Sequence, residues 1–143
     1  MNKNIMAVCL TFSLLILNGR LYAQAWEARV QTHYFYEYDY DLQKAKTTSI
    51  KKPCSFLVDI SSSGTGKFVF LDDEYGDKFV YQIIRAEETN YSDGTPYVRL
   101  TTSMKGKQQS VFVEYKTNRK GYRTITKIVL FRDRENDATV FTN

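Results

Sequence analysis

Apolar and polar side chains alternate along most of the chain beyond residue 25, and the longest example comes first. Between Trp26 and Asp41 the odd positions are polar apart from Phe35, whereas the even positions are apolar, aromatic or threonine. Successive side chains of a strand point to opposite sides, so the pattern predicts a half-buried strand with one aromatic face. At about 3.3 Å per residue this strand is too long for a small domain, so we expect it to bend, to carry a bulge or to project. The even positions are Trp26, Ala28, Val30, Thr32, Tyr34, Tyr36, Tyr38 and Tyr40.

Shorter alternating segments follow, separated by turn residues, and none shows a helical apolar period. Asp93-Gly94 is the strongest hairpin signal, because two-residue turns between strands favour this dipeptide. We expect the long connection from Asp41 to Pro53 to hold a helical turn or to cross between two sheet edges. The other predicted strands are Ser55–Ile60, Lys67–Leu71, Lys78–Glu87, Tyr97–Ser103, Ser110–Tyr115, Tyr122–Phe131 and Ala138–Thr142.

The number and spacing of these segments predict the fold class. Short links between consecutive strands favour antiparallel pairing of neighbours. Strands without helices bury their apolar faces by closing into a barrel or by stacking as two sheets. We therefore predict an all-β fold of about eight antiparallel strands in a meander, arranged as a small barrel or a sandwich.

The first 25 residues have the composition of a secretory signal peptide. Lys3 precedes an apolar run, Ile5–Leu17, and Ala23-Gln24-Ala25 offers small residues at the positions that a signal peptidase reads. The run has 13 residues, whereas a membrane-spanning helix needs about 20, so we expect no transmembrane span. We assign residues 1–25 to the signal peptide and residues 26–143 to a single all-β domain, exported to the periplasm or the extracellular space.

The order and spacing of several segments are similar to those of known sequences. They comprise four strand segments, the Asp93-Gly94 hairpin and the Ala-Gln-Ala end of the signal. The segments are Phe56–Ile60, Lys67–Leu71, Phe79–Ile84 and Ile125–Phe131. In this combination the chain resembles a group of small exported all-β proteins from Bacteroidota, over roughly the region from Phe56 to Asn143. Members of that group have no assigned activity. The resemblance therefore implies an exported all-β fold and transfers no functional residue.

Charge is distributed unevenly over the predicted domain. Residues 26–94 contain 8 basic and 12 acidic side chains, whereas residues 95–134 contain 10 basic and 2 acidic ones. Acidic and basic strands that lie side by side would pair these charges across the sheet. The alternative is a basic face for an anionic polymer or a lipid headgroup. Because we expect export, nucleic acid is not among the predicted partners.

Few residues offer catalytic or metal chemistry. The single histidine, His33, falls on the polar face of the first strand, where we expect it to be solvated. Cys54 remains alone once Cys9 leaves with the signal; we interpret it as a small buried hydrophobe, the alternative being an exposed thiol that pairs with another chain. The acids between Asp72 and Asp77 do not match the spacing of a calcium loop. We predict no catalytic residue, no metal site and no cofactor.

The tyrosines of the first strand are the candidate binding residues. Tyrosine combines an apolar ring with a polar hydroxyl, so it suits both a half-wet core and a binding surface. In one interpretation Tyr34 and Tyr36 belong to the core and place their hydroxyls at the rim of the barrel. In the other, Tyr38 and Tyr40 extend past the core beside acidic residues and form an exposed arm for a sugar or a protein. We take Tyr36, Tyr38 and Tyr40 as the candidate ligand- or partner-binding residues.

These features predict an exported, non-catalytic binding or interaction module of the periplasm or the cell surface. Its expected partner is a protein, a glycan or a small apolar ligand held in the mouth of a closed barrel. One alternative is a small hydrolytic enzyme with carboxylates that we do not identify, which a pocket lined by clustered acids would favour. The other is an envelope assembly protein that binds by strand addition, which a filled core with an unpaired edge within residues 26–40 would favour.

Overall fold

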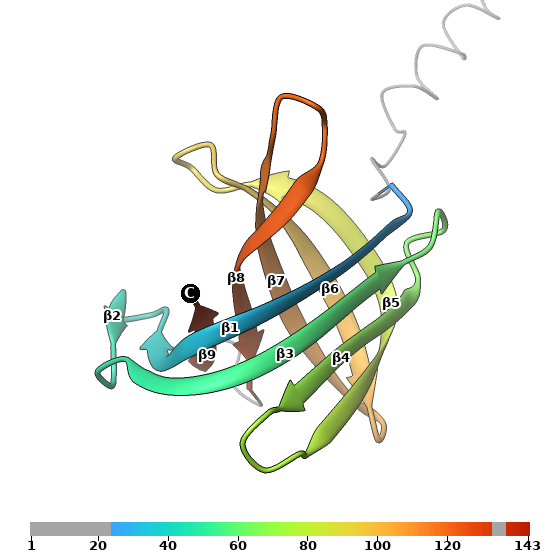
Figure 1. Cartoon of the computed structure of the whole chain (residues 1–143). Coiled ribbons are helices and arrows are strands. Elements are labelled where there is room, and N and C mark those ends of the chain that lie inside the picture. The colour runs from blue at the N-terminus through green and yellow to red at the C-terminus, as the bar shows by residue number, and fades with distance from the viewer. Residues whose placement is uncertain (1–23, 133–136) are drawn as a thin grey trace, which may run out of the picture.

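The computed structural model describes residues 24–132 and 137–143, which form a single sheet of nine antiparallel strands (Figure 1). Within these two ranges no helix is long and apolar enough to cross a membrane. The strands are β1 (Trp26–Asp39), β2 (Lys44–Ala45), β3 (Ile50–Ile60), β4 (Gly66–Asp72), β5 (Lys78–Asn90), β6 (Pro96–Met104), β7 (Lys107–Thr117), β8 (Arg123–Phe131) and β9 (Asp137–Thr142).

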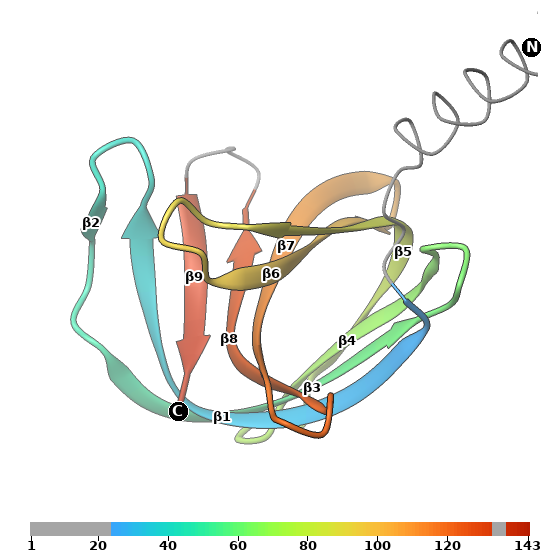
Figure 2. The ribbon, with the colours of Figure 1, turned by 90° about the horizontal axis from the view of Figure 1, so that it is seen from above.

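The sheet closes on itself because β1 has two long neighbours. It pairs with β3 along its first part and with β9 along its last part, while β4 to β8 each pair with the strand before and the strand after. Eight strands therefore form a closed barrel, and the short β2 continues the sheet beside the end of β1 (Figure 2). The predicted all-β barrel of about eight antiparallel strands is confirmed.

A register shift at His33 divides β1 into two parts. Thr32 pairs with Cys54, but Tyr34 pairs with Lys51, so the two strands use different numbers of residues over this stretch. An irregularity of this kind, a β-bulge, bends a strand and re-aims its side chains. The extra residue lies on β3, where Lys52 and Pro53 stand opposite His33. The long first strand bends along its length (Figure 2), as expected.

The shift exchanges the two faces of β1. Ahead of it, Trp26, Ala28 and Val30 pack against the barrel core; beyond it, Phe35 takes the inward position and lies 6.3 Å from Phe141, measured between ring centroids. A change of one position moves every following side chain to the opposite side of the sheet. The tyrosines that follow therefore lie on the outside of the barrel. The expectation of one continuous aromatic face is wrong for this reason.

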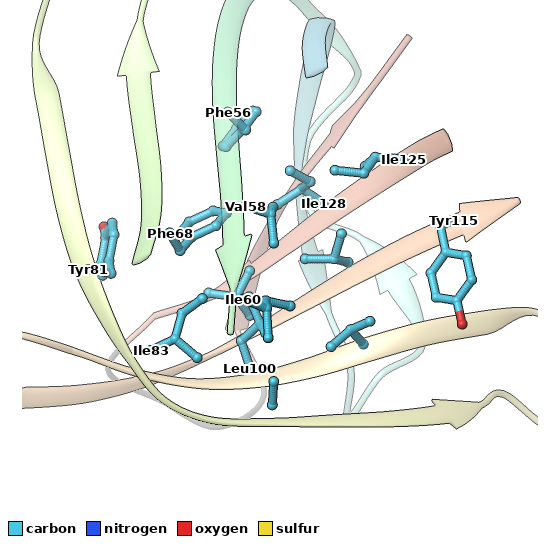
Figure 3. Packing of buried hydrophobic residues seen from close by; sticks show 14 of the residues in the cluster. Phe56, Val58, Ile60, Phe68, Tyr81, Ile83, Leu100, Tyr115, Ile125 and Ile128 are labelled. Carbon is cyan, nitrogen blue, oxygen red and sulfur yellow. The ribbon is translucent and has the colours of Figure 1, made fainter. Parts of the chain in front are cut away.

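Side chains fill the barrel interior (Figure 3). Phe56 stacks on Phe70 with 5.1 Å between ring centroids, and Phe68 lies 5.8 Å from Phe56 and 5.6 Å from Tyr81. Leu100 and Ile128 are completely buried. Interiors packed to this extent leave little room for a ligand, and the two tyrosine-lined pockets described below lie on the outer surface.

An aromatic and cationic cluster covers one end of the barrel. The Arg123 guanidinium lies 4.8 Å from the ring centroid of Tyr115 and 5.6 Å from that of Trp26. Its Nη1 atom also donates to Glu88 Oε1 at 2.6 Å. Because the cation is both paired and stacked, it can remain largely buried at this position.

The barrel wall has a seam between β1 and β8. The pairing of β1 with β9 starts at Tyr34, so the stretch from Trp26 to His33 has no strand partner on that side among the described residues. Trp26, Ala28 and Val30 are only half-buried there. Contacts of Trp26 with Tyr115 and with Arg123 of β8 nevertheless close the seam. Strand addition at this edge would have to separate these side chains, so the assembly alternative remains a prediction.

The connection after β1 differs from the expectation. It contains the short β2 and no helical turn, and β3 already begins at Ile50.

A second register shift, between Ile83 and Arg85, turns Ile84 outward, where 46 % of its surface is exposed. An apolar side chain at such a position follows the strand pattern of the sequence but contributes little to the core.

Cys54 is fully buried, as the interpretation of a small hydrophobe requires. Its neighbours on β3 that point inward, Phe56 and Val58, belong to the same core cluster. Burial, followed by the nearby Asp72 carboxylate, raises the pKa of the thiol to about 11. The thiol is therefore protonated at neutral pH and poorly placed for pairing with another chain.

We predict that Phe68→Ala lowers the free energy of unfolding by about 3–5 kcal/mol, because the fully buried ring leaves a cavity among Phe56, Tyr81 and their neighbours. Ile84→Ala on the outer surface is the matched control and should cost less than about 1 kcal/mol. Urea denaturation followed by circular dichroism measures both. Equal losses would contradict the assignment of inward and outward faces.

Candidate functional site

The β5–β6 hairpin forms one wall of a pocket on the outside of the barrel. Strand β4 pairs with β5 only as far as Ile83. The part of the β5–β6 hairpin beyond Ile83 does not pair with β4 and can therefore bend. Figure 2 shows its tip, in yellow, lying over β8 and β9. The hollow beneath it has a volume of about 390 Å³ and is called the tyrosine cradle here. It is lined by Tyr36, Tyr38, Tyr40, Tyr91, Ser92, Asp93, Thr95, Glu114, Lys127 and Val140.

A second hydrophobic cluster, outside the barrel, forms the floor of the cradle. Val129 and Phe131 of β8 alternate with inward residues and therefore face outward, as do Ala138 and Val140 of β9. All four are buried, because tyrosines of β1 and Phe112 of β7 pack over them. The barrel wall is thus apolar on both faces at this place, and the outer layer holds the tyrosines in fixed positions.

Seven aromatic rings run continuously around the cradle. Tyr38 lies 6.4 Å from Tyr36 and 4.9 Å from Tyr40, both with edge-to-face geometry. Tyr40 continues to Phe131 at 5.1 Å. From there the chain passes through Phe112 and Tyr97 to Tyr91, with centroid separations of 4.7, 4.9 and 4.2 Å. Each pair adds stabilisation beyond its buried area, so the rings hold one another in place.

Backbone hydrogen bonds fix the tip of the β5–β6 hairpin. The Tyr91 N–H donates to the Thr95 carbonyl at 3.0 Å, and the Gly94 N–H donates to the Tyr91 carbonyl at 2.9 Å. Asp93 accepts a hydrogen bond from the Thr95 N–H at 2.8 Å, which lowers the pKa of its carboxyl. Gly94 has φ +85°, a conformation that favours glycine. The predicted Asp93-Gly94 turn is confirmed.

An ion pair with a buried carboxylate lies on the wall beneath the hairpin. Glu114 of β7 and Lys127 of β8 are directly opposite each other in the sheet, and Lys127 Nζ donates to Glu114 Oε1 at 3.0 Å. Only 7 % of the Glu114 surface is exposed, whereas 35 % of the Lys127 side chain is. The carboxylate is therefore held inside the wall, and the lysine reaches it from the surface.

The buried carboxylate acts on the tyrosines around it. Burial first, and the Glu114 charge second, raise the pKa of Tyr40 to about 12. The same two causes, in the same order, raise the pKa of Tyr91. The hydroxyl oxygen of Tyr91 is buried beside Glu114, without a well-formed hydrogen bond.

Tyr36 and Tyr38 also border a second hollow, of about 600 Å³, on the side of β2. Residues 45–49 form the other wall of this hollow. Two contacts hold this segment against the barrel. The Glu37 N–H donates to Thr47 Oγ1 at 3.0 Å, and Lys46 Nζ forms an ion pair of 2.6 Å with Asp137 Oδ1. The two tyrosines therefore form a ridge between two concave surfaces.

The structure revises both interpretations of the tyrosine stripe. Tyr34 is 40 % exposed and not part of the core. Tyr38 and Tyr40 do not form an exposed arm either, since both are half-buried against the outer cluster. The three candidates Tyr36, Tyr38 and Tyr40 do lie together in one pocket. They do so as an outer layer of the barrel.

Sequence reasoning missed the other half of the cradle. Tyr91 lies about a third of the chain length beyond the end of the first strand. The alternation of β7 and β8 gives no sign that Glu114 and Lys127 meet in the pocket. Tyr91 does immediately precede the Ser-Asp-Gly turn, a position from which a side chain can reach across a hairpin tip. The alternation of apolar and polar residues along β5 and β6 does not predict that the hairpin bends back over the barrel.

The other residues considered in the sequence analysis either take part in structural contacts or are exposed. Asp72 forms an ion pair of 2.6 Å with Lys52 and accepts the N–H groups of Glu74 and Tyr75. Burial opposes its ionisation, but the hydrogen bond from Lys52 and those from the backbone hold its pKa below the usual value. His33 is exposed at the register shift. No group of three or more metal-ligating side chains gathers within the described ranges.

Comparisons with protein-family models, with curated proteins and with solved structures found no match to this chain. The site is therefore interpreted from its own geometry.

We predict that Glu114→Gln lowers the pKa of Tyr40 from about 12 while leaving it above the usual value of 10.0, because the negative charge is lost and burial remains. A folded-state pKa above that of the unfolded chain contributes stability at lower pH, which is lost as the pH rises from about 10 to about 12. The variant should therefore lose less stability over this interval. Ultraviolet titration with urea melts at each pH measures both effects. Unchanged titration would show that Glu114 does not act on Tyr40.

Proposed function

We propose that this protein is an exported, non-catalytic binding module that holds a saccharide in the tyrosine cradle. The observation that carries the proposal is the ion pair of the buried Glu114 with the half-buried Lys127, which lies beneath the hairpin and is bordered by four tyrosines. Such a site combines ring faces with hydrogen-bonding groups of both kinds. Binding sites of this type use a few fixed polar groups for orientation and apolar surface for affinity.

The cradle lining carries two carboxyl groups, Asp93 and Glu114, and one ammonium group, Lys127, and this excess of acids disfavours an anionic ligand. We take the ligand to be neutral because its hydroxyl groups can use both members of the ion pair. A sugar hydroxyl can donate to the carboxylate and accept from the ammonium group at the same time. The C–H faces of a sugar ring match the flat rings of Tyr36 and Tyr38.

The same geometry supports binding over hydrolysis. Glycoside hydrolysis uses two carboxyl groups, one of which donates a proton and therefore needs a raised pKa. In the cradle, Glu114 is engaged by Lys127 and Asp93 is engaged by its own turn, with a lowered pKa. Neither carboxyl has the surroundings of a general acid.

The export proposal rests on the sequence. The apolar run after Lys3 and the Ala-Gln-Ala site direct a chain across the inner membrane. Polysaccharides of the envelope and of the surroundings are then accessible. A small barrel with a rigid outer pocket suits capture of such chains.

We predict that the protein binds at least one neutral oligosaccharide from a panel of hexose and N-acetylhexosamine chains in isothermal titration calorimetry. Tyr38→Ala should weaken this binding about tenfold, because one stacking ring is lost, whereas Tyr38→Phe should retain most of it. Tyr75→Ala is the matched control, since this tyrosine is exposed in the β4–β5 turn outside the cradle. Absence of binding to the whole panel, or equal losses in Tyr38→Ala and Tyr75→Ala, would overturn the proposal.

A further inference from the structure

The β7–β8 hairpin stands out from the end of the barrel, in orange at the top of Figure 1. Its turn is rigidly built around Asn118. The Asn118 side-chain oxygen accepts the N–H groups of Lys120 at 2.9 Å and of Tyr122 at 3.0 Å. The Asn118 N–H donates to the Tyr122 carbonyl at 2.9 Å, and Gly121 has φ +84°. The side chains at this tip are therefore presented by a fixed backbone.

Three cations at this tip have no acidic partner. Lys116, Arg119 and Lys120 are exposed, and no carboxylate within residues 24–132 and 137–143 forms an ion pair with them. Among the other cations of the basic half, Arg99 and Lys105 are likewise exposed, whereas two arginines pair with acids of the other half. Arg123 pairs with Glu88 and Arg132 pairs with Glu37, both across the halves of the chain. The cationic excess of residues 95–134 is thus partly neutralised by pairing and partly concentrated at the hairpin tip.

An aromatic ring accompanies these cations. Tyr122 is 69 % exposed at the tip, whereas Tyr115 of the same hairpin is buried. A tyrosine ring is amphipathic, and tyrosine is enriched where a protein meets the boundary between lipid headgroups and hydrocarbon. Cations beside such a ring are attracted by anionic headgroups.

We propose that the tip of the β7–β8 hairpin, residues 116–122, docks on a bilayer that contains anionic phospholipid. The three cations contact lipid phosphates, and the Tyr122 ring enters the headgroup layer. A soluble polyanion would use the cations but would leave the ring without a partner, which is why a bilayer fits the tip better. The surface is separate from the tyrosine cradle, so this inference stands independently of the proposed function.

The experiment is co-sedimentation of the protein with vesicles of phosphatidylcholine and phosphatidylglycerol, compared with phosphatidylcholine alone. We expect binding to the anionic vesicles that weakens as salt is added. Each cation near a membrane contributes a factor of about five, so Arg119→Ala combined with Lys120→Ala should weaken binding about 30-fold. Tyr122→Ser should weaken it further, and Tyr122→Trp should strengthen it.

The matched control removes two lysines elsewhere, Lys51→Ala with Lys105→Ala, and leaves the net charge equal to that of the tip variant. Both lysines are exposed. Retained binding in this control is the expected result. The proposal is overturned if the control and the tip variant lose binding equally, or if neither vesicle binds. It is also overturned if polyphosphate binds through Arg119 and Lys120 while Tyr122→Ser has no effect, because the partner would then be a soluble polyanion.

Discussion

Closure of the barrel depends on β1, which pairs with two neighbouring strands around an interior that other side chains occupy. The strand pairs with β3 at its beginning and with β9 at its end, and it closes the barrel only by doing both. Four tyrosines follow Thr32 at every second position, and the core around Phe56 and Phe68 has no volume left for them. The register shift at His33 resolves this conflict, because it turns the tyrosines outward and brings Phe35 in.

The outer layer follows from that shift. Once the rings lie outside, they bury the outward side chains of β8 and β9, and the wall acquires a second apolar cluster. The β5–β6 hairpin extends beyond the end of β4 and bends over this layer, which encloses the ion pair of Glu114 and Lys127. A charge pair of this kind contributes little to stability compared with apolar residues of the same volume.

Much of the fold could be predicted because period-two alternation is a local property. The strands around Phe56, Phe68 and Val111 lie close to their predicted positions, and the Asp93-Gly94 turn was recognisable from its dipeptide. Register shifts were not recognisable, because His33 and Ile84 look like any other strand residue. Half of the site was predictable for the same reason. Tyr36 and Tyr38 lie on β1 and Tyr40 follows it directly, whereas their positions beside Tyr91 and Glu114 depend on the bending of a distant hairpin, which no local pattern encodes.

The most direct test of the account is a nuclear Overhauser experiment on the tyrosine rings of β1. The account predicts cross-peaks from Tyr36 to the methyl groups of Val140 and from Tyr38 to Ala138, the residues opposite them on the outer face. Phe35 should instead show cross-peaks to Phe141 inside the barrel. Cross-peaks from Tyr36 or Tyr38 to Phe141 would place the tyrosines in the interior, and would contradict both the face exchange at His33 and the tyrosine cradle.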